Sequence, residues 1–154
     1  MNLLTCHLIL DNIRSLHNVG SIFRTADSFG IQKIWLCGIT GKPPHREIQK
    51  TALGATESVD WEYRPSTLEV IKLLKSETFQ IVGLEQTESS QILQQVKPTF
   101  PLALILGHEV QGVSAEVLLH CDACWEIPQL GKKQSMNVSV TAGMTMFHLS
   151  LFRG

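Results

Sequence analysis

The stretch with the richest chemistry spans residues 126–142, where a strand end meets a basic, glycine-containing loop and then an apolar helix. In α/β proteins, ligands lie in the crevice beyond the carboxyl ends of the strands, where helix N-termini offer free N–H groups. Ser135, Met136 and Asn137 stand at this junction and supply hydroxyl, amide and backbone donors. The pattern indicates a ligand site, although Ser135 and Asn137 could also serve only as caps of the helix.

Two other places hold residue types that suit a site. Glu109 follows Gly107 at an expected strand end, and the glycine allows a ligand to approach the backbone closely. Asn18 and Arg24 lie six residues apart on an expected helix, so both side chains can face one groove at its start. Simpler interpretations stay open: an ordinary turn around Glu109, a capping Asn18 and a solvent-exposed Arg24.

Strands and helices alternate along the chain, and they must position these residues. Apolar runs predict strands over residues 3–10, 33–37, 58–63, 79–84, 101–106 and 124–127. Helical patterns cover residues 18–29, 46–53, 66–75, 89–96, 114–119 and 137–152. The alternation predicts an α/β fold with a mainly parallel sheet of about six strands and helices on both faces. The very apolar run 101–106 should lie at the centre of the sheet.

Side chains mark several helix ends. Asn18 is a suitable N-cap for the first helix, and Gly30 a suitable left-handed stop. Ser66 and Glu69 fit a capping box at the start of a later helix. The last helix, residues 137–152, is apolar almost all round and must be covered on several sides. A chain of this size does not easily cover it alone, so we infer a subunit interface there.

Length and charge limit the class of protein. The 154 residues, 44% of them hydrophobic, fit a single domain over residues 1–154. Thirteen Lys and Arg against fourteen Asp and Glu give a formal charge of -1, so any nucleic-acid contact must be local. Residues 11–50 carry an excess of cations, which fits either a phosphate-facing patch or ordinary solvated charge. No membrane helix and no signal peptide are evident, so we expect a cytoplasmic protein.

The cysteines and the glycine motifs exclude several other classes. Cys121 and Cys124 form a C-x-x-C, but a second ligand pair is missing, and Cys6 and Cys37 fall in apolar runs. We therefore expect small buried residues rather than a metal site. Neither G-x-G-x-x-G after the first strand nor a Walker motif occurs, which argues against a standard dinucleotide-binding or P-loop enzyme.

Three segments, taken in order, resemble the motifs of the SpoU/TrmH family of RNA ribose 2'-O-methyltransferases. They read Asn-x-Gly-x-x-x-Arg-x-Ala-x-x-Phe-Gly from residue 18, Leu-Gly-x-Glu-x-x-Gly-x-Ser from residue 106, and Ile-Pro-x-x-Gly-x-x-x-Ser-Met-Asn-Val-Ser from residue 127. The resemblance covers nearly the whole chain. It implies the SPOUT fold, in which the C-terminal part of the domain is tied in a deep trefoil knot.

The resemblance also implies a cofactor and a set of site residues. Family members bind S-adenosylmethionine in the knot, mainly through backbone groups, at positions that match Leu84, Gly107, Ile127, Ser135 and Met136. The family's catalytic positions match Arg24, Asn18, Glu109, Ser135 and Asn137. Family members act as homodimers in which the arginine that matches Arg24 reaches the partner's site.

The reaction implied is attack of a ribose 2'-hydroxyl on the methyl group of the cofactor. A guanidinium has a pKa above about 12, so we expect Arg24 to clamp a phosphate or the developing alkoxide charge, with a role as base left open. We expect tRNA as the substrate, rRNA next, with a partner protein as a possible source of RNA affinity. The alternative is a non-catalytic RNA- or nucleotide-binding relative of the same fold.

Overall fold

The computed structural model describes residues 5–133 and 135–152, and it contains one seven-stranded sheet in which all pairings are parallel. The spatial order of the strands is β3-β2-β1-β6-β4-β7-β5. Their bounds are β1 Cys6–Asp11, β2 Lys33–Cys37, β3 Asp60–Arg64, β4 Gln80–Leu84, β5 Gln91–Ile92, β6 Leu102–Leu106 and β7 Ala123–Glu126. The expected α/β fold is confirmed, with one strand more than predicted.

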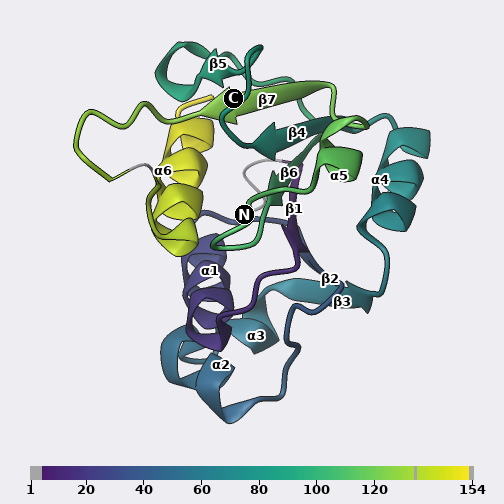
Figure 1. Ribbon diagram of the computed structural model, residues 1–154. Helices are drawn as coiled ribbons and strands as arrows, with labels where there is room; N and C mark the ends of the chain where they lie inside the picture. The colour runs from purple at the N-terminus through teal and green to yellow at the C-terminus, as the bar shows by residue number, and fades with distance from the viewer. Residues whose placement is uncertain (1–4, 134, 153–154) are drawn as a thin grey trace.

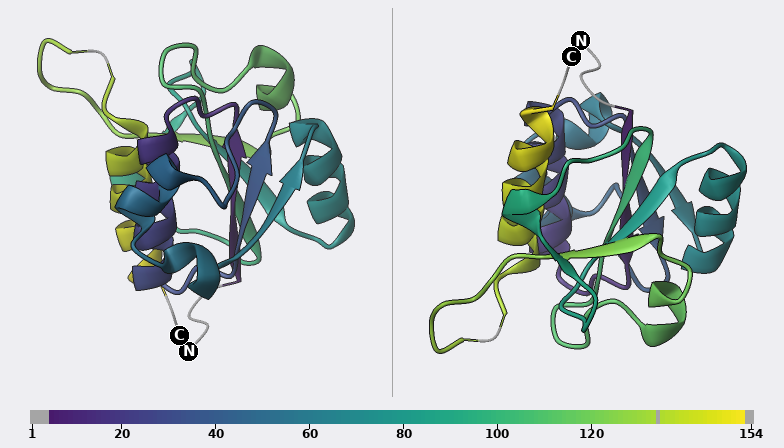
Figure 2. Two further views of the ribbon diagram at one scale, coloured as in Figure 1. Left: turned by 90° about the horizontal axis from the view of Figure 1, so that it is seen from below. Right: turned by 90° about the horizontal axis from the view of Figure 1, so that it is seen from above.

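Helices cover both faces of the sheet (Figure 1). They are α1 Leu16–Ser28, α2 Arg46–Ala52, α3 Ala55–Ser58, α4 Thr67–Ser76, α5 Ala115–Leu118, α6 Val138–Ser150 and the 3-10 helix η1 Leu93–Gln95. Figure 2 shows α1 and α6 side by side on one face, with α4 on the other. Two buried clusters follow from this layering, one under α1 and α6 and one under α4 and α5.

Strand β6 lies at the centre of the sheet, between β1 and β4, as its composition predicts. All five of its residues are buried. Leu104 belongs to the cluster under α1 and α6, whereas Ala103 and Ile105 belong to the other, because successive side chains of a strand point to opposite faces. A strand covered on both faces needs apolar residues at every position, which explains the continuous apolar run.

The N-cap of α1 is Ser15, and the prediction of Asn18 was wrong. The Ser15 hydroxyl accepts a hydrogen bond from the Asn18 backbone N–H at 3.1 Å. The helix therefore starts earlier than predicted, and the Asn18 side chain is available for other contacts. Gly30 has a φ of 67°, so the left-handed stop is confirmed.

The cap of α4 is confirmed, because the Ser66 hydroxyl accepts from the Glu69 backbone N–H at 3.2 Å. The second half of the predicted capping box is not formed within the described residues, because the Glu69 carboxylate accepts from the Arg64 guanidinium at 2.9 Å and not from the Ser66 backbone N–H.

The region around β5 differs from the prediction of a helix over residues 89–96. Residues 91–92 pair with β7 as an edge strand, and η1 follows. A two-residue strand has no local hydrophobic period, so only the neighbouring strand defines it. The predicted strand 58–63 also starts later than expected, because residues 55–58 form α3.

Cys6 and Cys37 are buried as expected, and all four cysteines are free, but Cys121 and Cys124 are only partly buried. Within residues 5–133 and 135–152, no helix has the length and apolar character needed to cross a membrane. The C-terminal knot implied by the resemblance stays a prediction.

Candidate active site

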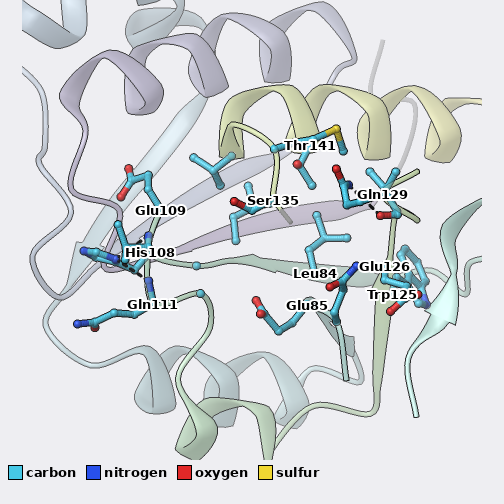
Figure 3. A pocket seen from close by; sticks show the side chains of 18 residues that line it. Leu84, Glu85, His108, Glu109, Gln111, Trp125, Glu126, Gln129, Ser135 and Thr141 are labelled. Carbon is cyan, nitrogen blue, oxygen red and sulfur yellow. Dashed lines mark hydrogen bonds between the residues drawn. The ribbon is translucent and has the colours of Figure 1, made fainter. Parts of the chain in front are cut away.

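A pocket opens at the carboxyl ends of three neighbouring strands, β6, β4 and β7 (Figure 3). Because all strands are parallel, the loops that follow them meet at one edge of the sheet. The lining residues are Leu84, Glu85, Gln86, Leu106, Gly107, His108, Glu109, Val110, Gln111, Gly112, Trp125, Glu126, Ile127, Gln129, Ser135, Met136, Val138 and Thr141. Segments far apart in sequence therefore build one site.

All five positions that match the family's cofactor-binding residues line this pocket. They are Leu84, Gly107, Ile127, Ser135 and Met136. In Figure 3, Glu109 and His108 lie at one end of the pocket and Trp125 and Glu126 at the other, with Ser135 between them. Apolar side chains and carboxylates share the walls, and neither lysine nor arginine occurs among the described lining residues.

The loop from Gly107 to Val113 is closed tightly on itself. The backbone groups of His108 and Gly112 exchange hydrogen bonds of 3.2 and 2.8 Å. A Cβ added at Gly107 would lie 2.4 Å from the Val113 nitrogen, so only glycine fits this approach. His108 Nδ1 also accepts from the backbone N–H groups of Val110 and Gln111, each at 3.1 Å. The pocket wall is thus fixed by backbone contacts.

Glu109 joins this loop to the start of α1. Its carboxylate accepts hydrogen bonds from the backbone N–H groups of Arg14 at 3.1 Å and Ser15 at 2.9 Å, and from the Asn18 side-chain amide at 3.4 Å. Burial raises the pKa of Glu109, but the hydrogen bonds outweigh it and hold the pKa below its ordinary value. The carboxylate stays ionised, and the structure brings two predicted residues, Asn18 and Glu109, together.

Arg24, Asn18 and Asn137 do not line the pocket of their own chain. Arg24 is exposed on α1. Asn137 is the N-cap of α6, where its side-chain oxygen accepts from the Ser139 backbone N–H at 2.8 Å. Asn137 therefore caps the helix, which is one of the two interpretations that its sequence position allowed. Ser135 is exposed but does line the pocket.

Glu85 lies in the wall of the pocket and was not predicted from the sequence. It directly follows β4, and its Oε2 accepts from the Val113 backbone N–H at 3.3 Å. Burial raises the pKa of Glu85, and that hydrogen bond only partly opposes the shift. Its position immediately after a strand was the available signal, because ligand-binding groups gather at carboxyl ends of strands.

The lining residues have the chemistry that a nucleoside cofactor needs. Leu84 and Ile127 offer apolar surface for a flat ring, and Ser135 offers a hydroxyl beside it. Carboxylates without neighbouring cations suit a ligand that carries positive charge.

The match to a known family extends over most of the chain, since residues 5–147 match the SpoU rRNA Methylase family. The chain is 33% identical over 147 residues to the 23S rRNA (guanosine-2'-O-)-methyltransferase RlmB of Pectobacterium atrosepticum. It is 32% identical over 140 residues to the tRNA (guanosine(18)-2'-O)-methyltransferase of Thermus thermophilus. These alignments cover 96% and 91% of this chain, but only 60% and 71% of the two relatives.

Solved structures agree with this match. The A. aeolicus TrmH/SpoU tRNA modifying enzyme superposes with a TM-score of 0.87 at 28% identity, over 96% of this chain and 74% of that one. An AdoMet-bound rRNA methyltransferase from Sinorhizobium meliloti gives 0.87 at 26% identity, over 94% and 55%. The family match, the relatives above 30% identity and the shared fold all agree with the motif resemblance, and we conclude that the chain belongs to the SpoU rRNA Methylase family.

Proposed function

We propose that this protein is an RNA methyltransferase that transfers a methyl group from S-adenosylmethionine to a ribose 2'-hydroxyl. One observation carries the proposal: all five family-matched cofactor positions line a single pocket at the carboxyl edge of the sheet. The names of the two relatives, one an rRNA and one a tRNA 2'-O-methyltransferase, support the reaction type. The chain spans only 60% of the length of the rRNA relative, so the activity and the RNA substrate of that relative are proposed, not established, for this chain.

The cofactor would contribute a methyl group that its sulfonium already makes electrophilic. The protein then has to bind the cofactor and the RNA, orient the ribose hydroxyl toward the methyl group, and exclude water from the site. Leu84 and Ile127 would hold the adenine against apolar surface, while the fixed loop after Gly107 offers backbone groups. Glu109, anchored by three hydrogen bonds, would hold the start of α1 and Asn18 next to the loop that lines the pocket.

Arg24 would act in the pocket of a partner subunit. It is exposed and does not line its own pocket, which supports a role in trans. Helix α6 and its C-cap leave apolar side chains in solvent: Val140 and Phe147 of the helix are exposed by 52 and 57%, and the C-cap Leu151 by 64%. Covering that face would bury substantial apolar area, which favours a homodimer. Arg24 would then stabilise the negative charge that develops on the attacking oxygen.

The substrate we would test first is tRNA, with rRNA next. Both relatives' names specify a guanosine, so a guanosine ribose is the first candidate acceptor. A partner protein could add RNA affinity, because the overall charge of -1 supplies little attraction to phosphate. An RNA-modifying enzyme works where its RNA is found, and we therefore place it in the cytoplasm.

The test is transfer of isotope-labelled methyl groups to separate tRNA and rRNA fractions, followed by digestion to nucleosides. The expected product is a 2'-O-methylated nucleoside. Label on a base would contradict the ribose acceptor. Cofactor binding without any transfer to either RNA would favour the non-catalytic relative.

A further inference from the structure

Three carboxylates occur among the described residues that line the pocket, and the protein holds them to different degrees. Glu109 accepts from the start of α1, as described above. Glu126 Oε2 accepts from the Ser90 hydroxyl at 2.6 Å. Glu85 is the third, and Figure 3 shows it between the two ends of the pocket.

The Glu85 carboxylate is positioned mainly by packing against the backbone and has only one hydrogen bond among the described residues. Its Oε2 accepts one long bond from the Val113 N–H at 3.3 Å, and Oε1 has no donor within the described ranges 5–133 and 135–152. A Cβ added at Gly112 would lie 2.7 and 2.8 Å from the two carboxylate oxygens, so the carboxylate packs against bare backbone. Gly112, with a φ of 69°, leaves the space that the carboxylate occupies.

This environment leaves the ionised form of Glu85 short of partners. Burial raises the pKa of Glu85 because the carboxylate loses water and gains only one backbone donor. A cation in the pocket would restore the lost stabilisation, since opposite charges attract strongly where water is excluded. No lysine or arginine of the described lining residues can do so. A cationic ligand in the pocket would supply such a partner.

We propose that Glu85 binds a positively charged group of S-adenosylmethionine, so that the pocket selects its cofactor partly by charge. The inference rests on the proposed function. The cofactor carries two cationic groups, the α-ammonium and the methylated sulfonium. S-adenosylhomocysteine keeps the ammonium and lacks the sulfonium charge, so comparing the two ligands identifies which group Glu85 contacts.

The substitution Glu85→Gln separates this role from a structural one. Glutamine has nearly the same shape, and its carbonyl oxygen can still accept from the Val113 N–H, but it carries no charge. The matched control is Glu88→Gln, which makes the same chemical change in the same loop at an exposed position outside the pocket. Thermal unfolding of both variants checks that they fold as the unmodified protein does.

The measurement is calorimetric titration of the full chain with S-adenosylmethionine and with S-adenosylhomocysteine. Glu85→Gln should weaken binding of S-adenosylmethionine by roughly 10- to 100-fold, the usual effect of losing a charged partner. Glu88→Gln should change it by less than about threefold, as exposed charges do. Equal weakening for both ligands would identify the ammonium as the contact, and weakening for S-adenosylmethionine alone would identify the sulfonium.

Two results would overturn the proposal. One is a folded Glu85→Gln variant that binds both ligands as tightly as the unmodified protein. The other comes from Glu85→Asp, which keeps the charge on a shorter side chain and should lose less affinity than Glu85→Gln. Equal losses in the two variants would mean that shape, not charge, is recognised. If the unmodified protein binds neither ligand, the proposed function itself fails, which is a distinguishable outcome.

Discussion

The hydrogen bonds of a single side chain can fix its protonation state. His7 is a clear case outside the active site. Its Nδ1 accepts from the Trp35 indole N–H at 3.1 Å, and its Nε2 lies 3.0 Å from the Gln32 side-chain oxygen. The first contact requires an unprotonated Nδ1, so the imidazole must be neutral, with its proton on Nε2.

This arrangement predicts a pH-dependent stability. Burial lowers the pKa of His7, as does Lys33 nearby, while the Gln32 hydrogen bond and Glu77 oppose the shift. The unfolded chain, with a histidine pKa of about 6.5, then binds the proton more tightly than the folded one. The free energy of unfolding should be fully retained above about pH 6.5 and fall as the pH drops through the folded pKa.

Urea unfolding at about pH 7.5 and about pH 5.5 measures this loss. His7→Gln removes the titrating group, so this variant should lose less stability between the two pH values than the unmodified protein. An equal loss in both proteins would mean that other groups cause the acid sensitivity.

Arg24→Ala should lower the rate of methyl transfer by at least about 100-fold, because the negative charge that develops on the ribose 2'-oxygen loses its cationic partner. Cofactor affinity should not change, since Arg24 does not line its own pocket and is proposed to act on the attacking ribose oxygen, not on the cofactor, in the partner's pocket. Arg24→Lys keeps the charge without the planar fork and should recover only part of the activity. Loss of cofactor affinity in Arg24→Ala would contradict the assigned role.

Among the elements, the loop after β6 combines a close backbone approach with contacts that shape the pocket. It must turn within a few residues, present backbone groups to the pocket and hold Glu109 against the start of α1. The close approach of Gly107 to Val113 makes this possible. In this loop, backbone packing and the proposed cofactor binding therefore depend on the same residue, Gly107.

Gly107→Ala should disturb both properties. The added Cβ would clash with backbone at 2.4 Å, so we expect a loss of about 1–3 kcal/mol in unfolding free energy and weaker binding of S-adenosylmethionine. Gly143→Ala in α6 is the control, because its Cβ would meet only the Thr25 methyl group at an ordinary 3.7 Å. That variant should be as stable as the unmodified protein or slightly more stable. Calorimetry and thermal unfolding give both readouts.

At the scale of the whole molecule, a single chain leaves an apolar face of α6 exposed to solvent. Helix α6 packs with one side on α1, where Phe147 contacts the Phe29 ring edge-on at 6.4 Å between centroids. Its other side forms an apolar groove with η1, lined in part by Leu93, Met144 and Leu151. The inferred dimer would cover this groove.

Leu151→Glu should separate the dimer into monomers and reduce methyl transfer, because Arg24 would no longer reach a partner's pocket. Light scattering during size exclusion measures the mass. Leu119→Glu, at a residue that is 84% exposed after α5, should leave the dimer intact. Mixing Arg24→Ala with Gly107→Ala subunits adds a direct test, since only action in trans restores one working site per mixed dimer. No recovery on mixing would contradict the shared site.

Local patterns in the sequence were enough to predict many of the strands and helices of this protein. Strand β2 was predicted with its observed bounds, the Ser66 cap was found, and the apolar run 101–106 was placed at the centre of the sheet. These features depend on neighbours within a few residues, through hydrophobic period and capping geometry. The family motifs added five positions predicted to bind the cofactor, and all five line one pocket.

Only the tertiary structure decided which distant residues meet. Glu109 accepts from Ser15 across 94 positions of sequence, and Glu85 from Val113 across 28. The two-residue β5 exists because β7 lies beside it, and the exposure of Arg24 follows from how α1 packs. Such contacts depend on strand order and helix packing, which no local pattern encodes. For this reason the sequence alone identified the edge of the sheet and the motif residues, but not the carboxylate proposed to select the cofactor.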